Sequence, residues 1–149
     1  MANTFTQLLY HIVFSTKDRR PLIHADRSEE LFRYIWGINN NLDCHLYRIN
    51  AVEDHIHILT HIHPTVAVAE YAKKVKSSST TWIQKENIFH RWLGWQDGYA
   101  AFTHSIGEKE RLMDYVKGQQ EHHKRESFVD ELKRLLMEAK IEFDEKYLL

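Results

Sequence analysis

The sequence predicts an α+β fold in which helices cover one face of a four-stranded antiparallel sheet and further helices follow at the C-terminus. Two observations predict it. Segments rich in β-preferring residues and segments with helical spacing succeed one another in the order β-α-β-β-α-β. Two more helical segments then end the chain. This is the order of ferredoxin-like and RRM-like domains, and it leaves the second face of the sheet open for a site or a partner.

The first strand and the first helix are predicted in the N-terminal third of the chain. Residues 6–14 are rich in apolar and β-preferring types and predict a strand. Asp26 followed by Glu29 resembles a capping box, which favours the start of a helix. A helix is predicted over residues 27–42, because apolar residues recur there at helical spacing: Leu31, Ile35, Ile38 and Leu42.

Two strands and a second helix are predicted in the middle of the chain. Residues 44–52 and 55–63 predict strands that are separated by a polar turn at residues 53–54. The second helix is predicted to begin at residues 64–65, where a proline precedes the helical pattern. One face of this helix carries Val68, Ala72, Val75, Ser79 and Trp82.

The last elements follow a loop that contains two glycines. Residues 99–103 predict the fourth strand. Ser105 and Glu108 form a second capping-box pattern, which predicts a helix that continues to about His123. Ser127 is expected to cap a final helix with four apolar residues on one face: Leu132, Leu135, Leu136 and Ala139.

Length and composition limit the class of protein. A chain of 149 residues with 43% hydrophobic residues suits one domain, spanning residues 1–149, with a sizeable core. We expect no secretory signal and no membrane partner, because no apolar run approaches the roughly 20 residues of a membrane span. Cys44 is the only cysteine, so no internal disulfide can form and a cytoplasmic location is expected.

The charge distribution argues against binding of nucleic acid through a large positively charged surface. The net charge is −1. Residues 126–149 hold four Lys or Arg and seven Asp or Glu, so the rest of the chain carries a net charge of +2. Contact with DNA, if the chain makes it, is therefore expected to be local and based on shape.

Histidines concentrate in the third predicted strand, and the chain has eleven in all. Because strand side chains alternate between faces, His55, His57, His61 and His63 are expected on the open face, opposite the isoleucines between them. Two imidazoles two residues apart on one strand face can share a metal ion. The alternative is that all four are ordinary polar residues on a solvated face.

Two other metal motifs fail on spacing. A histidine-triad nucleotide hydrolase requires a histidine where the chain has Leu59. A metallo-β-lactamase type of site requires an aspartate at that position and a histidine in place of Thr60. What remains is a His-hydrophobe-His pair.

A tyrosine in the third predicted helix lies on a polar line rather than in the apolar stripe. This line consists of Arg111, Tyr115, Gln119 and His122. Tyr115 is therefore either a half-buried residue that covers the core or a displayed functional group. A tyrosine hydroxyl is a poor nucleophile, because its pKa is near 10, but a metal that polarises a phosphate can assist it. Gly118 can permit another backbone to approach this helix closely.

Basic and aromatic residues offer further candidates for DNA contact. The basic residues follow the first strand or lie on the second helix: Lys17, Arg19, Arg20, Lys73, Lys74 and Lys76. Solvated turn and helix faces are the alternative interpretation of this set. Trp92, Trp95 and Tyr99 could stack on bases, although a place in the core is the more common role of such residues.

Four segments together resemble a known family. They are residues 12–17 (IVFSTK), 52–57 (VEDHIH), 95–99 (WQDGY) and 115–119 (YVKGQ). In this order and spacing they resemble single-tyrosine transposases of the HUH superfamily, of the insertion-sequence 200 type, and their repeat-associated relatives. The resemblance extends over nearly the whole chain.

The resemblance implies a reaction, a cofactor and an assembly. It implies that His55, His57 and Gln119 bind Mg²⁺ or Mn²⁺, and that Tyr115 is the nucleophile that attaches to the 5′ side of a cut in single-stranded DNA. It further implies DNA hairpins as substrates and homodimers with composite active sites. Gly118 departs from the asparagine that relatives often have, and His61 and His63 match no role in the family.

Three functions therefore stay open. The first is a transposase that cleaves and rejoins single-stranded DNA at hairpin-marked ends. The second is a host-adopted nickase of repeated hairpins that uses the same chemistry. The third is a non-catalytic, ferredoxin-like nucleic-acid-binding module, in which aromatic residues of the central strands would stack on bases. The histidines at the corresponding positions argue against the third.

Overall fold

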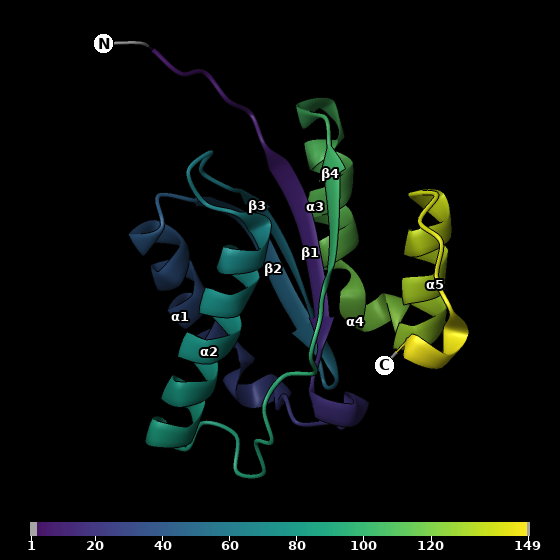
Figure 1. Cartoon of the computed structure of the whole chain (residues 1–149). Helices are drawn as coiled ribbons and strands as arrows, with labels where there is room; N and C mark the ends of the chain where they lie inside the picture. Colours follow the sequence, from purple (N-terminus) through teal and green to yellow (C-terminus); the bar gives the residue numbers. More distant parts are fainter. Residues whose placement is uncertain (1–2, 149) are drawn as a thin grey trace.

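A computed structural model describes residues 3–148 (Figure 1). The strands and α-helices are, in chain order, β1 (Leu9–Ser15), α1 (Ser28–Asn41), β2 (His45–Val52), β3 (His55–His61), α2 (Val68–Glu86), β4 (Ala100–His104), α3 (Lys109–Lys117), α4 (Gln119–His122) and α5 (Phe128–Glu138). Single 3₁₀ turns are η1 (Lys17–Arg19), η2 (Ala25–Arg27), η3 (Ile106–Glu108) and η4 (Glu145–Tyr147). The predicted β-α-β-β-α-β order is confirmed.

The four strands form one antiparallel sheet in the order β2-β3-β1-β4. Helices α1 and α2 pack on one face of it (Figure 1). Ile12 of β1 and Ile56 and Ile58 of β3 point to this side, fully buried in the main core with Leu31 of α1 and Val75 of α2. The period of two along the strands therefore places the isoleucines of β3 under the helices, as predicted.

The second face of the sheet is covered, so the expectation of an open face is wrong. Helices α3, α4 and α5 lie on that side (Figure 1). The buried side chains of α3 pack with Leu9 and Leu59 of the sheet. Phe128 and Leu136 of α5 pack with Val13 and Phe102. The alternate strand residues on this side include apolar ones, whose burial favours coverage of the face by the returning chain.

The four predicted helix starts differ in outcome. Ser127 does cap α5, because its hydroxyl accepts a hydrogen bond from the backbone N–H of Asp130 at 3.2 Å. Neither capping box forms: α1 begins at Ser28 and α3 at Lys109, both without a side-chain cap. α2 begins at Val68 rather than at residues 64–65, because the backbone N–H of Val66 bonds to the carbonyl of His63 in a separate turn.

The helix predicted from Ser105 to His123 is divided. A 3₁₀ turn precedes α3, and Gly118 separates α3 from α4. Asn50 of β2 explains the second division, because its side-chain amide donates to the carbonyls of Val116 at 2.9 Å and Lys117 at 3.2 Å. This contact fixes the end of α3 against the sheet.

The aromatic residues near the glycine loop divide between core and surface. Trp92 and Trp95 belong to the main core, each with 8% of its surface exposed. Tyr99 is 42% exposed. None of the helices in residues 3–148 combines the length and the apolar character that crossing a bilayer requires.

A buried polar chain links both helices of the first layer to the sheet. The side-chain amide of Asn39 in α1 donates to the hydroxyl of Thr60 in β3 at 2.8 Å. The hydroxyl of Tyr71 in α2 donates to the carbonyl oxygen of the same amide at 2.8 Å. All three residues are completely buried. Removal of Asn39 therefore takes away the acceptor of the Tyr71 hydroxyl and a donor to Thr60, whose hydroxyl still donates to the carbonyl of His45.

We expect Asn39→Ala to lower the free energy of unfolding by about 2–3 kcal/mol, because it deprives both Thr60 and Tyr71 of a buried partner. Denaturant unfolding measures the effect. Asn40→Ala is the matched control, since this neighbour is exposed and its loss is expected to change the free energy by less than about 0.5 kcal/mol. Equal effects of the two substitutions would contradict the assigned role of Asn39.

Candidate active site

β3 delivers two histidines to the covered face of the sheet. His55 and His57 are two residues apart, so their side chains point to the same side, and both are completely buried. Their ring centroids lie 5.1 Å apart. The C-terminal part of the chain closes over them, because His123, which follows α4, and Glu131 of α5 lie in the same cluster as the two imidazoles.

Three imidazole nitrogens converge on one carboxylate oxygen. The Nε2 atoms of His55, His57 and His123 lie 3.2, 3.0 and 3.0 Å from Oε1 of Glu131. Glu131 belongs to α5 and is completely buried. These four residues, called the histidine cluster below, could bind a metal ion, because imidazole nitrogen and carboxylate oxygen are common ligands of divalent metals. Gln119 lies beside them, with its Oε1 2.8 Å from Nε2 of His123.

The side chains of the cluster fit a cation. Nε2 of His55 is buried and has no hydrogen bond among the described residues, which is costly for a polar atom. Burial lowers the pKa of His57 to about 4, so this imidazole is neutral at neutral pH, as a metal ligand must be. Burial also lowers the pKa of His55, but the carboxylates of Asp54 and Glu131 outweigh it and raise the pKa overall.

A second layer of contacts orients the two histidines. Nδ1 of His55 lies 2.7 Å from Oδ1 of Asp54, and Nδ1 of His57 lies 2.8 Å from Nε2 of His11. Both Nε2 atoms are thereby turned toward Glu131. Burial, followed by the charge of His57, keeps the pKa of His11 well below its usual value. Metal-binding histidines commonly use their second nitrogen in this way.

Tyr115 meets the histidine cluster within the same chain. Its ring centroid lies 5.9 Å from that of His57. Its hydroxyl donates a hydrogen bond to Oε2 of Glu131 and accepts one from Nη2 of Arg134 at 2.7 Å. Burial, followed by the hydrogen bond and charge of Glu131, raises the pKa of Tyr115, while Arg134 acts in the opposite direction.

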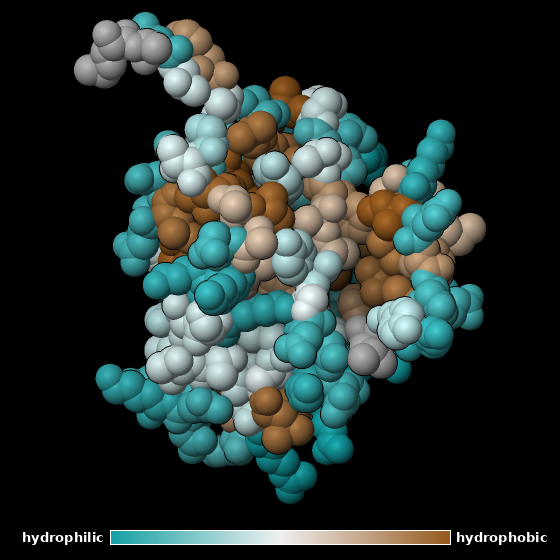
Figure 2. Space-filling view, in the orientation of Figure 1, coloured by the Kyte–Doolittle hydropathy of each residue, from teal (hydrophilic) through white to brown (hydrophobic). Residues whose placement is uncertain are grey.

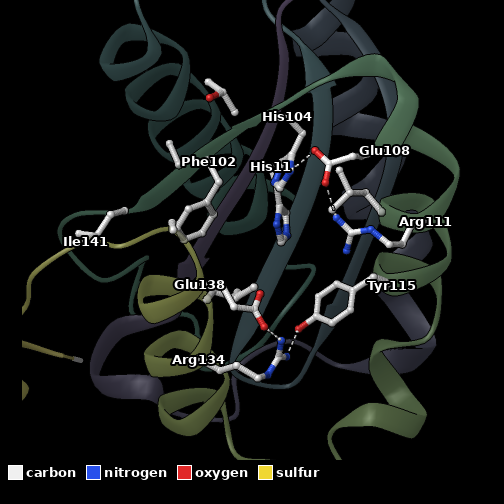
Figure 3. Close-up of a pocket in the computed structure, with 14 residues that line it drawn as sticks. His11, Phe102, His104, Glu108, Arg111, Tyr115, Arg134, Glu138 and Ile141 are labelled. Carbon is white, nitrogen blue, oxygen red and sulfur yellow. Dashed lines mark hydrogen bonds and ion pairs between the residues drawn. The ribbon is translucent and has the colours of Figure 1, made fainter.

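A cavity of about 610 Å³ adjoins the tyrosine. Figure 3 shows Tyr115 and Arg134 pointing toward each other on its lower side, with His104 and Arg111 near its upper end. His11 lines it from the sheet. A ligand in the cavity can therefore reach the tyrosine hydroxyl while the histidine cluster stays enclosed.

The family follows from comparison with known proteins. Residues 4–119 match the family described as transposase, IS200-like. The chain belongs to this family. The transposases for the insertion sequence element IS200 of Salmonella typhimurium strain LT2 and Salmonella typhi are each 23% identical to it over 130 residues, which cover 83% of this chain and 84% of theirs.

Solved structures share the fold of this transposase. The crystal structure of a candidate transposase from Deinococcus radiodurans R1 matches with a TM-score of 0.61 and 18% identity, over 80% of this chain and 96% of that one. A REP-associated tyrosine transposase bound to a REP hairpin matches with a TM-score of 0.60 and 12% identity, over 83% and 74%. The α+β fold class is thus confirmed.

The four histidines whose side chains were expected on one face of the sheet do not stay together in the structure. Only His55 and His57 reach the cluster. Nδ1 of His61 accepts a hydrogen bond from the backbone N–H of Leu8 at 3.0 Å. β3 ends at His61, so His63 lies beyond the strand, with its Nδ1 2.7 Å from the Thr65 hydroxyl. The prediction of one face for all four is therefore wrong for His63.

The polar line on the third predicted helix also divides. Tyr115 and Gln119 point into the site, and Gln119 is completely buried. Arg111 is largely exposed and pairs with Glu108 at 2.8 Å. His122 stays beside the site, because its Nε2 lies 2.6 Å from Oε1 of Glu126 and 3.5 Å from Oε2 of Glu131. Gly118 interrupts the helix between Tyr115 and Gln119.

The basic residues proposed for DNA contact lie at the end of β1 and on α2. Arg20, Lys73 and Lys74 are exposed, and Lys17 and Arg19 are half-buried. Lys76 is bound internally, because its ammonium donates to the carbonyls of Gln96, at 2.8 Å, and Gly98. Burial lowers its pKa. Lys76 therefore holds the glycine loop against α2 in this structure.

Several residues of the site were not predicted from the sequence. His123 was predicted only as the approximate end of a helix, and that position gave no indication that its side chain reaches the histidines of β3. Glu131 and Arg134 stand on α5, and nothing in the sequence indicated that α5 folds over β3. His11 lies on the same sheet face as His57 because β1 pairs with β3, with Val13 opposite His57. His11 is two residues before Val13 on the same strand, so strand alternation places both side chains on one face, and this was the available signal in the sequence.

We expect Mn²⁺ or Mg²⁺ to raise the melting temperature of the transposase. A ligand at 100 times its dissociation constant stabilises a folded protein by about 2.7 kcal/mol. Thermal unfolding with and without the metal measures this. His57→Ala should abolish the increase, whereas His63→Ala should retain it, because His63 lies outside the cluster. An undiminished increase in His57→Ala would locate the metal elsewhere.

Proposed function

We propose that this transposase cleaves and rejoins single-stranded DNA at hairpin-marked ends through a 5′-phosphotyrosine intermediate, with Tyr115 as the nucleophile. The observation that carries the proposal is the meeting of the Tyr115 hydroxyl with the histidine cluster inside one chain. A covalent link to tyrosine conserves the energy of the broken phosphodiester for the later joining step. The adjoining cavity leaves the hydroxyl accessible to a DNA strand.

The proposed metal is Mg²⁺ or Mn²⁺, bound by His55, His57 and Gln119. The convergence of buried Nε2 atoms supports this assignment, and the distance of 2.8 Å between Gln119 and His123 supports the inclusion of the amide. When bound, such an ion supplies Lewis-acid polarisation of the phosphate. His123 and Glu131 are additional donors of the same cluster.

Hairpin DNA is the proposed substrate. One structural relative is a REP-associated tyrosine transposase bound to a REP hairpin, which supports the same class of ligand here. Arg20, Lys73 and Lys74 are exposed and are proposed to contact phosphates, together with Lys17 and Arg19. A non-catalytic module of the RRM type is disfavoured, because α3 and α5 cover the sheet face on which such modules stack bases.

We expect Tyr115→Phe to abolish the covalent protein–DNA adduct and to leave hairpin binding intact, because it removes only the hydroxyl. Incubation with labelled hairpin DNA and Mg²⁺ or Mn²⁺, followed by denaturing electrophoresis, measures the adduct. Tyr47→Phe is the control, since Tyr47 packs in the same small cluster beside α3. An adduct that persists in Tyr115→Phe would assign the nucleophile to another tyrosine.

We further propose a homodimer with composite active sites, in which the tyrosine of one chain serves the histidines of the other. In the single chain described above, Tyr115 lies against its own histidine cluster. Exchange between chains would require α3 to move relative to the sheet. Gly94 and Gly98 both have positive φ angles, but they precede β4, which is paired with β1. The movement would therefore take place in the residues that join β4 to α3.

Mixing of inactive subunits tests the composite arrangement. We expect His57→Ala and Tyr115→Phe chains, each inactive alone, to recover cleavage when they exchange, because each heterodimer then holds one site with intact histidines and an intact tyrosine. The quantity measured is the cleavage rate of the mixture. Mass spectrometry verifies that the subunits have exchanged. If the mixture then shows no cleavage, each site is built within one chain.

A further inference from the structure

We propose that Arg134 of α5 is a catalytic residue, which stabilises the tyrosyl oxygen of Tyr115 and the phosphate that this oxygen attacks. The inference rests on the proposed function, because it assigns a role in the reaction proposed for Tyr115. The family match covers residues 4–119, so Arg134 lies outside the matched segment.

Arg134 touches the atom that would react. Its Nη2 donates a hydrogen bond to the Tyr115 hydroxyl oxygen at 2.7 Å, and its guanidinium carbon lies 5.5 Å from the centre of the ring. Arg134 stands three residues after Glu131 on α5, which places both side chains on one face of the helix. The hydroxyl thus donates to a carboxylate and accepts from a cation.

Two other carboxylates hold the guanidinium in place. Nε and Nη2 of Arg134 donate to the two oxygens of Glu126 at 3.3 and 3.2 Å, and Nη1 donates to Glu138 at 3.2 Å. A donor fixed in this way needs little reorganisation when charge develops nearby. Among the described residues, the hydrogen bonds of Arg134 use four of its five N–H groups, so one remains for a phosphate oxygen.

The position of Arg134 gives a DNA strand access to it. The side chain is 35% exposed and lines the cavity of about 610 Å³ beside Tyr115 (Figure 3). Arg111 lines the same cavity. A phosphodiester in this cavity can therefore meet the tyrosine hydroxyl and the guanidinium together.

The chemistry requires a cation at this point. In cleavage, the bond from phosphorus to the Tyr115 oxygen forms while the bond from phosphorus to the 3′ oxygen breaks. The phenolic proton passes to water, and the 3′ oxygen takes a proton from water. In rejoining, the 3′ hydroxyl attacks and the tyrosyl oxygen leaves. Negative charge develops on the tyrosyl and phosphate oxygens in both directions, and Arg134 binds it more strongly than it binds the neutral phenol.

Single-turnover cleavage of labelled hairpin DNA tests the proposal in the full chain. We expect Arg134→Gln to slow adduct formation roughly 10²-fold and Arg134→Lys about tenfold, with hairpin affinity unchanged in both. Lys133→Gln is the matched control, because it removes the same charge from the same helix but pairs with Glu145 outside the cavity. It should cleave at the wild-type rate.

A second measurement separates charge stabilisation from mere support of α5. Tyr115→3-fluorotyrosine makes the phenol ionise more readily, so the phenolate depends less on Arg134. We expect the rate difference between Arg134 and Arg134→Gln to shrink several-fold in this background. A purely structural role would leave the difference unchanged, and that result would overturn the proposal.

The outcomes distinguish this inference from the proposed function. If the wild-type chain forms no adduct with hairpin DNA, both are overturned. If it does, and Arg134→Gln cleaves at the wild-type rate, only the role of Arg134 is overturned. If Arg134→Gln unfolds at a lower temperature than the wild-type chain, Arg134→Lys is compared with the wild type instead. Slower cleavage by folded Arg134→Lys supports the proposal, and an unchanged cleavage rate overturns it.

Discussion

Glu131 is a carboxylate buried between α5 and the sheet, and both of its oxygens have partners. Oε1 faces the three Nε2 atoms of the histidine cluster, and Oε2 accepts a hydrogen bond from Tyr115. A buried charge without partners would cost several kcal/mol, so Glu131 keeps its place only while these groups surround it. Burial opposes its ionisation, but hydrogen bonds from the histidines hold its pKa well below the usual value. The same contacts join β3, α3 and α5 to His123, which directly follows α4.

This constraint explains why polar residues occupy an interior layer of the protein. The main core between α1, α2 and the sheet is largely apolar, and its buried polar side chains, which include Asn39, Thr60 and Ser79, are hydrogen-bonded within it. The second layer instead has two small apolar clusters, with His55, His57 and Glu131 between them. Leu112 of α3 and Phe128 of α5 anchor the flanking clusters, so the helices dock by apolar contact while the polar groups face one another. The stability of this layer is thus coupled to the protonation and ligation of its site.

Much of the first layer was predictable from the sequence, since it depends on local periodicity. The period of two in β3 placed Ile56 on the side of the helices and His57 on the opposite side, and the structure agrees. The cap at Ser127 also followed from local chemistry. Prediction failed where a local pattern competed with a tertiary contact. The side-chain amide of Asn50 donates hydrogen bonds to the carbonyls at the end of α3. These bonds divide a helix that the spacing of residues in the sequence predicts as continuous.

The sequence by itself determined the order of the elements, the faces of the strands and the pairing of His55 with His57, because each depends on residues a few positions apart. The motif around Tyr115 was equally visible. Only the tertiary structure decided that the second sheet face is closed, and that Glu131 and Arg134 meet the tyrosine there. The physical reason is that α5 docks through apolar residues whose helical stripe would suit several surfaces. Which surface it covers depends on shape and on buried polar partners across the whole fold, and no local spacing encodes that choice.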